Sequence, residues 1–132
     1  MTALLAASFI TVAALFLYQV LSFKVGMARG KYGIQAPAVT GHPDFERIYR
    51  VQMNTLEQLV FFIPALWLFA VHVGHAQALG VLGVVWLAGR ILYARAYYRD
   101  AAKRSAGFIM ALLSANILLV WALMMMFIDP LA

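Results

Sequence analysis

The sequence predicts an all-α membrane protein, a bundle of four transmembrane helices, and two observations support this prediction. The chain has 132 residues, of which 65% are hydrophobic and only 11% are charged, whereas charged residues make up about 25% of an average soluble domain. A helix needs about 20 mostly apolar residues to cross the hydrocarbon core, and four such segments take up nearly the whole chain. We therefore expect a single integral membrane domain over residues 1–132 and no separate soluble domain.

The first two helices are expected over residues 4–29 and 43–73. Most of the first carries no charge, and no basic residue precedes it, so we interpret it as a retained helix and not as a cleaved signal peptide. Pro43 suits the first position of a helix, where its missing N–H costs nothing. Asp44 and Glu46 then lie in the first turn, where the helix dipole favours negative charge.

The last two helices are expected over residues 76–98 and 104–128. A tight turn leads into the first of this pair, and a short basic loop separates the two. Three glycines within the third helix would allow close contact with its neighbours: Gly80, Gly83 and Gly89.

The positions of the basic residues predict the orientation in the membrane. All ten Lys and Arg residues surround the first and third connections, and the positive-inside rule puts these connections on the cytoplasmic side and both termini on the opposite side. We therefore expect the residues behind the net charge of +5 to contact membrane lipids and not nucleic acid. The ten residues are Lys24, Arg29, Lys31, Arg47, Arg50, Arg90, Arg95, Arg99, Lys103 and Arg104.

Two polar stripes run along the cytoplasmic halves of the second and third helices. Spacings of three and four residues put each stripe on one helix face: Arg47, Arg50, Asn54 and Glu57 on one helix, and Arg90, Tyr93 and Tyr97 on the other. The helices are antiparallel, so both stripes would line one polar cleft open to the cytosol. Its cations outnumber its single deep carboxylate, so we expect an anionic ligand that also carries an ammonium group.

Another interpretation of these stripes is purely structural. Arg50, Glu57 and Arg90 could form ion pairs that fix helix packing, with the tyrosines as an interfacial belt; the chain would then be a structural trimer or a small transporter subunit. The excess of cations argues against this interpretation for the set as a whole. His72 and His75 lie at the opposite turn with no carboxylate nearby, so we predict no metal site.

Two segments resemble signatures of the MAPEG family, the membrane-associated proteins of eicosanoid and glutathione metabolism. The segment from Phe45 to Glu57, FERIYRVQMNTLE, resembles the second-helix signature. The segment from Gly89 to Tyr97, GRILYARAY, resembles the third-helix motif, and Arg104 sits where a catalytic arginine is expected. The resemblance covers essentially the whole chain, including its length and its four helices.

The resemblance implies a homotrimer that binds glutathione, as co-substrate, between neighbouring subunits near the cytoplasmic side. It implies that Arg104 favours the thiolate of glutathione, and that the thiolate attacks an apolar electrophile from the bilayer or, in peroxidase variants, a lipid hydroperoxide. The expected activity is that of a membrane-bound glutathione transferase without a metal. The residues implied in binding are Arg29, Arg50, Gln52, Asn54 and Arg90 for carboxylates and backbone, Glu57 for the ammonium, and Tyr93 and Tyr97 for packing on the peptide.

Two departures from the family pattern bear on the substrate. Gln58 follows Glu57 where leukotriene-C-forming relatives have a tyrosine, and Gly30 follows Arg29 where they have a second arginine. Both argue against leukotriene synthesis and favour a general transferase or peroxidase. The competing interpretation is a non-catalytic lipid- or thiol-binding protein of the same fold. Arg104 discriminates between the two, because a binder has no use for a cation at the sulfur.

Overall fold

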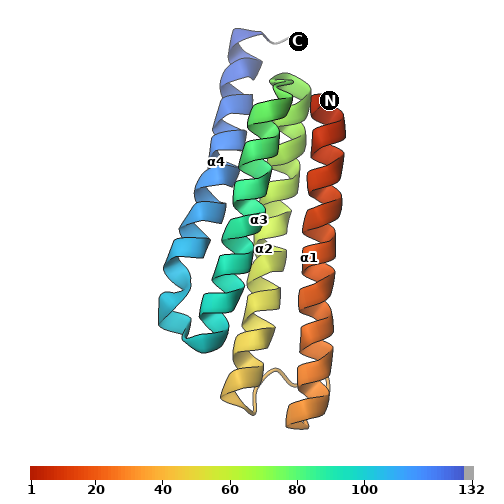
Figure 1. Ribbon diagram of the computed structural model, residues 1–132, viewed down its shortest axis with the longest axis vertical. Helices are drawn as coiled ribbons and strands as arrows, with labels where there is room; N and C mark the ends of the chain where they lie inside the picture. Colours follow the sequence, from red (N-terminus) through yellow and green to blue (C-terminus); the bar gives the residue numbers. More distant parts are fainter. Residues whose placement is uncertain (130–132) are drawn as a thin grey trace.

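The computed structural model describes residues 1–129 as four long helices in antiparallel order (Figure 1). They are α1 (Ala3–Tyr32), α2 (Pro43–His72), α3 (Ala76–Arg99) and α4 (Ser105–Ile128), and a short 3-10 helix, η1 (Ala101–Arg104), precedes α4. Within residues 1–129, four segments are long and apolar enough to span a membrane: α1, α2, α3, and η1 together with α4. The predicted all-helical membrane fold is confirmed.

Local capping determines where the helices end. Gly33 has a φ of 67° and its N–H donates to the Arg29 carbonyl; glycine adopts this left-handed conformation without the penalty that a side chain brings. For that reason α1 continues to Tyr32 and does not end at residue 29. At the start of α2, the His42 side chain accepts a hydrogen bond from the Asp44 N–H at 3.1 Å.

The two ends of the bundle differ in what they carry. Both termini lie at the end that also holds the turn between α2 and α3, and the α1–α2 loop and η1 lie at the other end (Figure 1). The basic residues belong to the helix segments next to that second end, which we call the basic end. The chain is a multi-pass integral membrane protein, and its charge is concentrated at one end of the bundle.

The core is formed by small and aromatic residues along the apolar part of the helices. α1 and α4 each pack against both α2 and α3. Phe62 of α2 and Trp86 of α3 are fully buried and stack with 4.0 Å between ring centroids. Trp67 of α2 donates to the Thr11 hydroxyl of α1 at 3.2 Å. Lipid tails are as apolar as this core, so tight packing and such hydrogen bonds stabilise the bundle.

Glycine allows α3 to approach two of its neighbours closely. A Cβ atom on Gly83 would lie 2.8 Å from the side chain of Ile10 in α1, and one on Gly89 would lie 2.8 Å from the backbone nitrogen of Ala111 in α4. Gly80 has no atom within 4 Å of the same position in the part of the chain that is described. The expected close contact therefore occurs at Gly83 and Gly89, and the expectation for Gly80 was wrong, because no described residue of this chain reaches the position of its Cβ atom.

Candidate functional site

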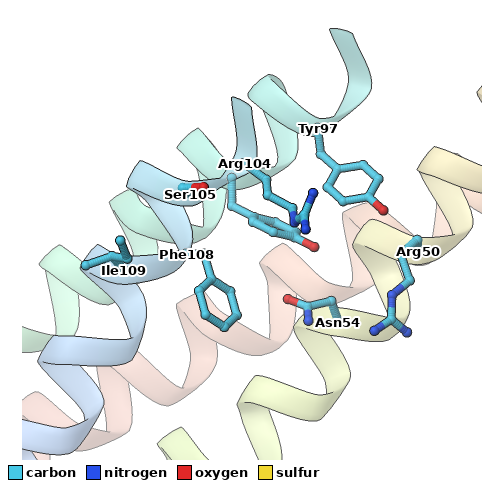
Figure 2. Close-up of a pocket in the computed structure, with 8 residues that line it drawn as sticks. Arg50, Asn54, Tyr97, Arg104, Ser105, Phe108 and Ile109 are labelled. Atoms are coloured by element: carbon cyan, nitrogen blue, oxygen red, sulfur yellow. The ribbon is translucent and has the colours of Figure 1, made fainter. Parts of the chain in front are cut away.

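A pocket of about 450 Å³ lies at the basic end, between α2 on one side and α3, η1 and the start of α4 on the other (Figure 2). Its wall is polar and basic near η1 and apolar along the first turn of α4. The side chains of Arg104, Tyr97 and Asn54 point toward a common space between the helices (Figure 2). The lining residues are Arg50, Asn54, Tyr93, Tyr97, Arg104, Ser105, Phe108 and Ile109.

The tyrosines of the third-helix stripe form the floor of this pocket. Tyr93 and Tyr97 lie one turn apart on α3 with 5.5 Å between ring centroids. Tyr93 is only 2% exposed and packs against Phe108 of α4 at 6.3 Å between ring centroids. The aromatic floor is rigid because Tyr93 is held between α3 and α4, and it offers ring faces and hydroxyl groups to a bound molecule.

Arg104 is positioned by the short η1 turn. The Asp100 side chain accepts a hydrogen bond from the Ala102 N–H at 3.0 Å and so caps η1. Arg104 ends the turn, and its Nη1 donates to the Ala101 carbonyl at 2.6 Å. Its Cζ lies 6.0 Å from the centroid of the Tyr97 ring. The guanidinium is thus anchored on its own turn and lies beside the tyrosine floor, at the exposed mouth of the pocket.

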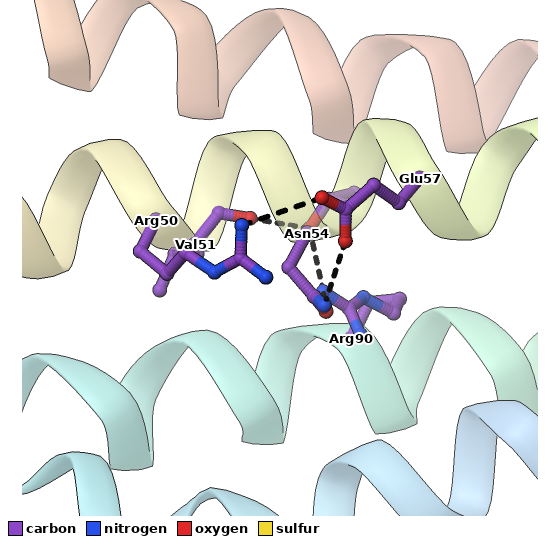
Figure 3. Close-up of polar contacts among 6 residues, drawn as sticks. Arg50, Val51, Asn54, Glu57 and Arg90 are labelled. Carbon is purple, nitrogen blue, oxygen red and sulfur yellow. Dashed lines mark hydrogen bonds and ion pairs between the residues drawn. The ribbon is translucent and has the colours of Figure 1, made fainter.

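A polar network on α2 includes two residues of the pocket lining, Arg50 and Asn54 (Figure 3). Arg50 donates to one oxygen of Glu57 at 3.3 Å, and Asn54 donates to the other at 3.3 Å. The side chains of Arg50 and Glu57 are each 52% exposed, and exposed ion pairs of this kind contribute about 1 kcal/mol or less. A ligand that brings its own carboxylate and ammonium can therefore replace the pair at little cost.

Arg90 lies behind this network and not in the pocket lining. It is fully buried, and its Nη2 donates to the Asn54 side-chain oxygen at 2.9 Å and to the Thr55 hydroxyl at 2.8 Å. Its Cζ is 4.1 Å from the centroid of the Tyr93 ring. Within residues 1–129, its Nε and Nη1 have no hydrogen-bond partner. Arg90 thus orients Asn54 and Tyr93 from below, as a buried cation whose hydrogen bonds are only partly satisfied.

Two of the residues expected to bind a ligand lie on another face of the same chain. Arg29 donates to the Ala38 carbonyl of the α1–α2 loop at 2.7 Å. Gln52 donates to the Ser22 hydroxyl of α1 at 3.1 Å. Neither lines the pocket. A single chain therefore leaves Arg29 and Gln52 on the α1–α2 face. It brings together in the pocket lining the expected residues Arg50, Asn54, Tyr93, Tyr97 and Arg104.

Sequence reasoning missed the contribution of α4 and of Thr55. Ser105, Phe108 and Ile109 line the pocket, and all three fall in the helix expected over residues 104–128, but the polar stripes that defined the cleft lay only on the second and third helices. Phe108 follows Arg104 by four residues, and this spacing would have placed both on one helix face. Thr55 bears no charge, so nothing in an apolar helix distinguished it from packing residues.

His75, at the far end of the bundle, has a local role. His75 accepts a hydrogen bond from the Ala78 N–H at 3.2 Å and caps α3. Over residues 1–129, His, Cys, Asp and Glu side chains form no group of three or more that could hold a metal ion.

Comparison with known proteins matches residues 7–124 of this chain to the MAPEG family. An uncharacterised protein of Synechocystis sp. is 55% identical over 123 residues, which cover 93% of this chain and 89% of that protein. Microsomal glutathione S-transferase 2 of Homo sapiens is 42% identical over 69% of this chain and 61% of its own length. Leukotriene C4 synthase of Bos taurus is 35% identical over 74% of this chain and 64% of its own length. The matched region thus spans less than two thirds of the last two relatives.

Proposed function

The chain belongs to the MAPEG family, and from this premise we propose that it is a membrane-bound glutathione transferase that conjugates glutathione to apolar electrophiles. The observation that carries the proposal is the position of Arg104 in the same pocket as Arg50 and Asn54, with Glu57 hydrogen-bonded to both of the latter. One end of this pocket suits the amino-acid end of glutathione, and the other suits its thiolate. The names of two relatives, a glutathione S-transferase and leukotriene C4 synthase, support a transferase.

Glutathione carries two carboxylates, one ammonium group and one thiol, and the pocket offers a partner for each kind of group. Arg50 would bind a carboxylate through charge-assisted hydrogen bonds, and Glu57 would accept from the ammonium. Arg50 would exchange its weak ion pair with Glu57 for the ligand carboxylate. Glu57 would exchange the same ion pair for the ligand ammonium group. Asn54 would donate to the ligand, and Tyr93 and Tyr97 would pack against the peptide.

The chemical step requires a thiolate at the other end of the pocket. A free thiol with a pKa near 8.5 is mostly protonated at neutral pH, and a nearby guanidinium favours the charged form. Each unit by which the thiol pKa falls gives up to about tenfold more thiolate. The thiol proton leaves to water, and the sulfur lone pair forms a C–S bond while the leaving group departs with its electron pair. The same thiolate would attack the terminal oxygen of a lipid hydroperoxide, which breaks the O–O bond, releases the lipid alkoxide to be protonated to the alcohol, and leaves glutathione as its sulfenic acid; a second glutathione thiol would then displace water from this sulfenic acid to give the disulfide.

An apolar path supports delivery of the electrophile from the bilayer. Ile109 lines the pocket, and it begins a row of residues on α4 spaced by four, four, three and four positions. Each member of the row is between 47% and 56% exposed. The row consists of Ile109, Leu113, Ile117, Val120 and Met124.

A homotrimer would complete this site. Arg29 and Gln52 lie on the α1–α2 face, where they donate to Ala38 and Ser22, and neither lines the pocket of its own chain. In a trimer of the kind that the family resemblance implies, this face of one chain would meet the pocket of the next. The exposed mouth at Arg104 would then be covered, and the site would lie near the cytoplasmic side.

The proposal is tested by stopped-flow absorbance near 240 nm, which follows the thiolate when protein purified in detergent is mixed with glutathione. We expect thiolate to form at neutral pH and the bound thiolate to react with an aryl halide. Binding of glutathione without thiolate would identify a binding protein in place of an enzyme. If glutathione does not bind at all, the pocket serves another ligand.

Arg50→Ala should weaken glutathione binding by roughly 10- to 100-fold, because a hydrogen bond to a charged group contributes about 1.5–3 kcal/mol. Isothermal titration of the detergent-solubilised protein measures this change. The matched control is Arg47→Ala, since Arg47 lies one turn away and pairs with Asp44 at 3.1 Å without lining the pocket. Equal losses in both variants would mean that Arg50 acts only through the general charge of this end.

Arg90→Met should leave the thermal stability equal to or above that of the wild type and yet weaken glutathione binding about tenfold. Burying a cation costs several kcal/mol unless it is well paired, and Arg90 bonds only the neutral side chains of Asn54 and Thr55. Methionine removes that cost at a similar side-chain length, but Asn54 loses the hydrogen bond that orients it. Thermal unfolding in detergent, with and without glutathione, measures both effects. A fall of the midpoint by many degrees would show that Arg90 is mainly structural.

A further inference from the structure

We infer that a second pocket at the basic end binds the headgroup phosphate of an anionic glycerophospholipid. This pocket, of about 470 Å³, lies where α1, α2 and α3 meet and shares no lining residue with the first. Its polar lining consists of Lys24, Lys31, Tyr32, Asp44 and Tyr98. The inference does not depend on the proposed transferase activity.

Two ammonium groups are held in place at this pocket. The Lys24 Nζ lies 4.8 Å from the centroid of the Tyr98 ring, and the Lys31 Nζ lies 5.3 Å from that of Tyr32. Both rings belong to the lining of the same pocket, and a cation within about 6 Å of a ring centroid is attracted to it. The two lysines are seven residues apart, so they share a helix face about 10 Å apart along the axis.

The remaining polar groups leave the pocket positive. Asp44 is the one carboxylate of the lining, and it is paired with Arg47 at 3.1 Å. The Tyr98 hydroxyl is buried and has no hydrogen-bond partner among residues 1–129, although buried hydroxyl groups normally have one. A phosphate oxygen would accept from this hydroxyl and from the ammonium groups, and would neutralise the excess charge.

The surface of α1 next to the pocket favours a lipid over a soluble phosphate. A row of apolar side chains, spaced by four, four, three and four residues, runs along α1 toward the pocket and ends at one of its lining residues, Met27. Each is more than half exposed, which provides a surface for an acyl chain directly beside the two lysines. The row consists of Val12, Phe16, Val20, Phe23 and Met27. Basic pockets between transmembrane helices are known to bind anionic headgroups.

The test compares lipid binding by the wild type and by the Lys24→Gln/Lys31→Gln double variant, both purified in detergent. Native mass spectrometry counts retained lipids, and the thermal midpoint is followed during titration with phosphatidylglycerol, with phosphatidylcholine and with inorganic phosphate. Each juxtamembrane lysine contributes about fivefold to binding of an anionic lipid, so the double variant should bind phosphatidylglycerol roughly 25-fold more weakly. The Arg99→Gln/Lys103→Gln variant is the matched control, because it loses the same charge outside the pocket lining and should bind as the wild type does.

Several outcomes would overturn the inference. Equal weakening in the control variant would mean that only the general charge of this end attracts the lipid. If phosphatidylcholine stabilises the protein as much as phosphatidylglycerol does, the pocket does not recognise the anionic headgroup. If inorganic phosphate stabilises it as much as phosphatidylglycerol does, the acyl chain does not contribute to binding. A change in oligomeric state of the Lys24→Gln/Lys31→Gln variant, measured by light scattering, would identify this face as a contact between subunits.

Discussion

Arg104→Ala is expected to slow conjugation about 100-fold or more while glutathione remains bound, because removing one group that stabilises a developing anion costs about 10²–10³ in rate. The wild-type guanidinium lies at the mouth of the pocket, held by the Ala101 carbonyl at 2.6 Å and beside the Tyr97 ring. The groups that we assign to the amino-acid end of glutathione, Arg50 and Glu57, are untouched by the change. The loss should therefore appear in thiolate formation and kcat, measured by stopped-flow absorbance and by product formation.

The pH dependence gives this prediction a second readout. A cation beside the sulfur lowers the pKa of the bound thiol, so its removal should move thiolate formation to higher pH, toward that of free glutathione. Arg104→Lys keeps the charge but loses the planar fork of donors, and should retain part of the activity. Lys103→Ala, one residue away and outside the lining, should behave as the wild type. Normal thiolate formation in Arg104→Ala would assign the activation of the thiol to another group.

Gly107→Ala is expected to lower the free energy of unfolding by about 3 kcal/mol, the upper part of the usual range for overpacking. A Cβ atom at Gly107 of α4 would collide with the backbone nitrogen of Tyr93 and would lie 2.5 Å from the Gly89 carbonyl oxygen of α3. These are backbone atoms, which cannot rotate away as a side chain can, so α3 and α4 must separate. Thermal or denaturant unfolding in detergent measures the loss.

The matched control for this change is Gly80→Ala in α3. No atom of the described residues lies within 4 Å of the added Cβ there, and alanine is up to about 1 kcal/mol better than glycine in a helix. This variant should be as stable as the wild type or more so. Because Tyr93 and Phe108 lie on the two helices that Gly107→Ala separates, that variant should also lose glutathione binding. Unchanged stability of Gly107→Ala would mean that α3 and α4 can separate at this position without loss of packing energy.

The fold was predictable because its determinants are local in the chain. Apolar stretches of about 20 residues identify membrane helices without knowledge of their neighbours. The two connections that the basic residues surround in the sequence lie at the same end of the bundle (Figure 1). The spacing of Arg50 and Asn54 on α2, and of Tyr93 and Tyr97 on α3, put each pair on one helix face, and both pairs line one pocket. Their roles toward glutathione stay predictions.

Other features depend on how each helix is rotated about its axis, and they could not be read from spacing. Arg90 belongs to the same stripe as Tyr93, yet it is fully buried beneath Asn54. Gln52 lies only two residues from Arg50, and this short step turns it from the pocket toward Ser22 of α1. Periodicity assigns residues to a face, but not the neighbour that the face meets.

The sequence by itself determined four membrane helices, their antiparallel order, the end of the bundle that is basic and the family to which the chain belongs. Only the tertiary structure decided which polar residues share a pocket and which glycines bring helices together. The physical reason is that hydropathy and periodicity act within one helix, whereas a pocket depends on the distance and rotation between helices. The close backbone approach at Gly89 and Gly107 fixes the distance and the rotation between α3 and α4, and so gives the site its shape.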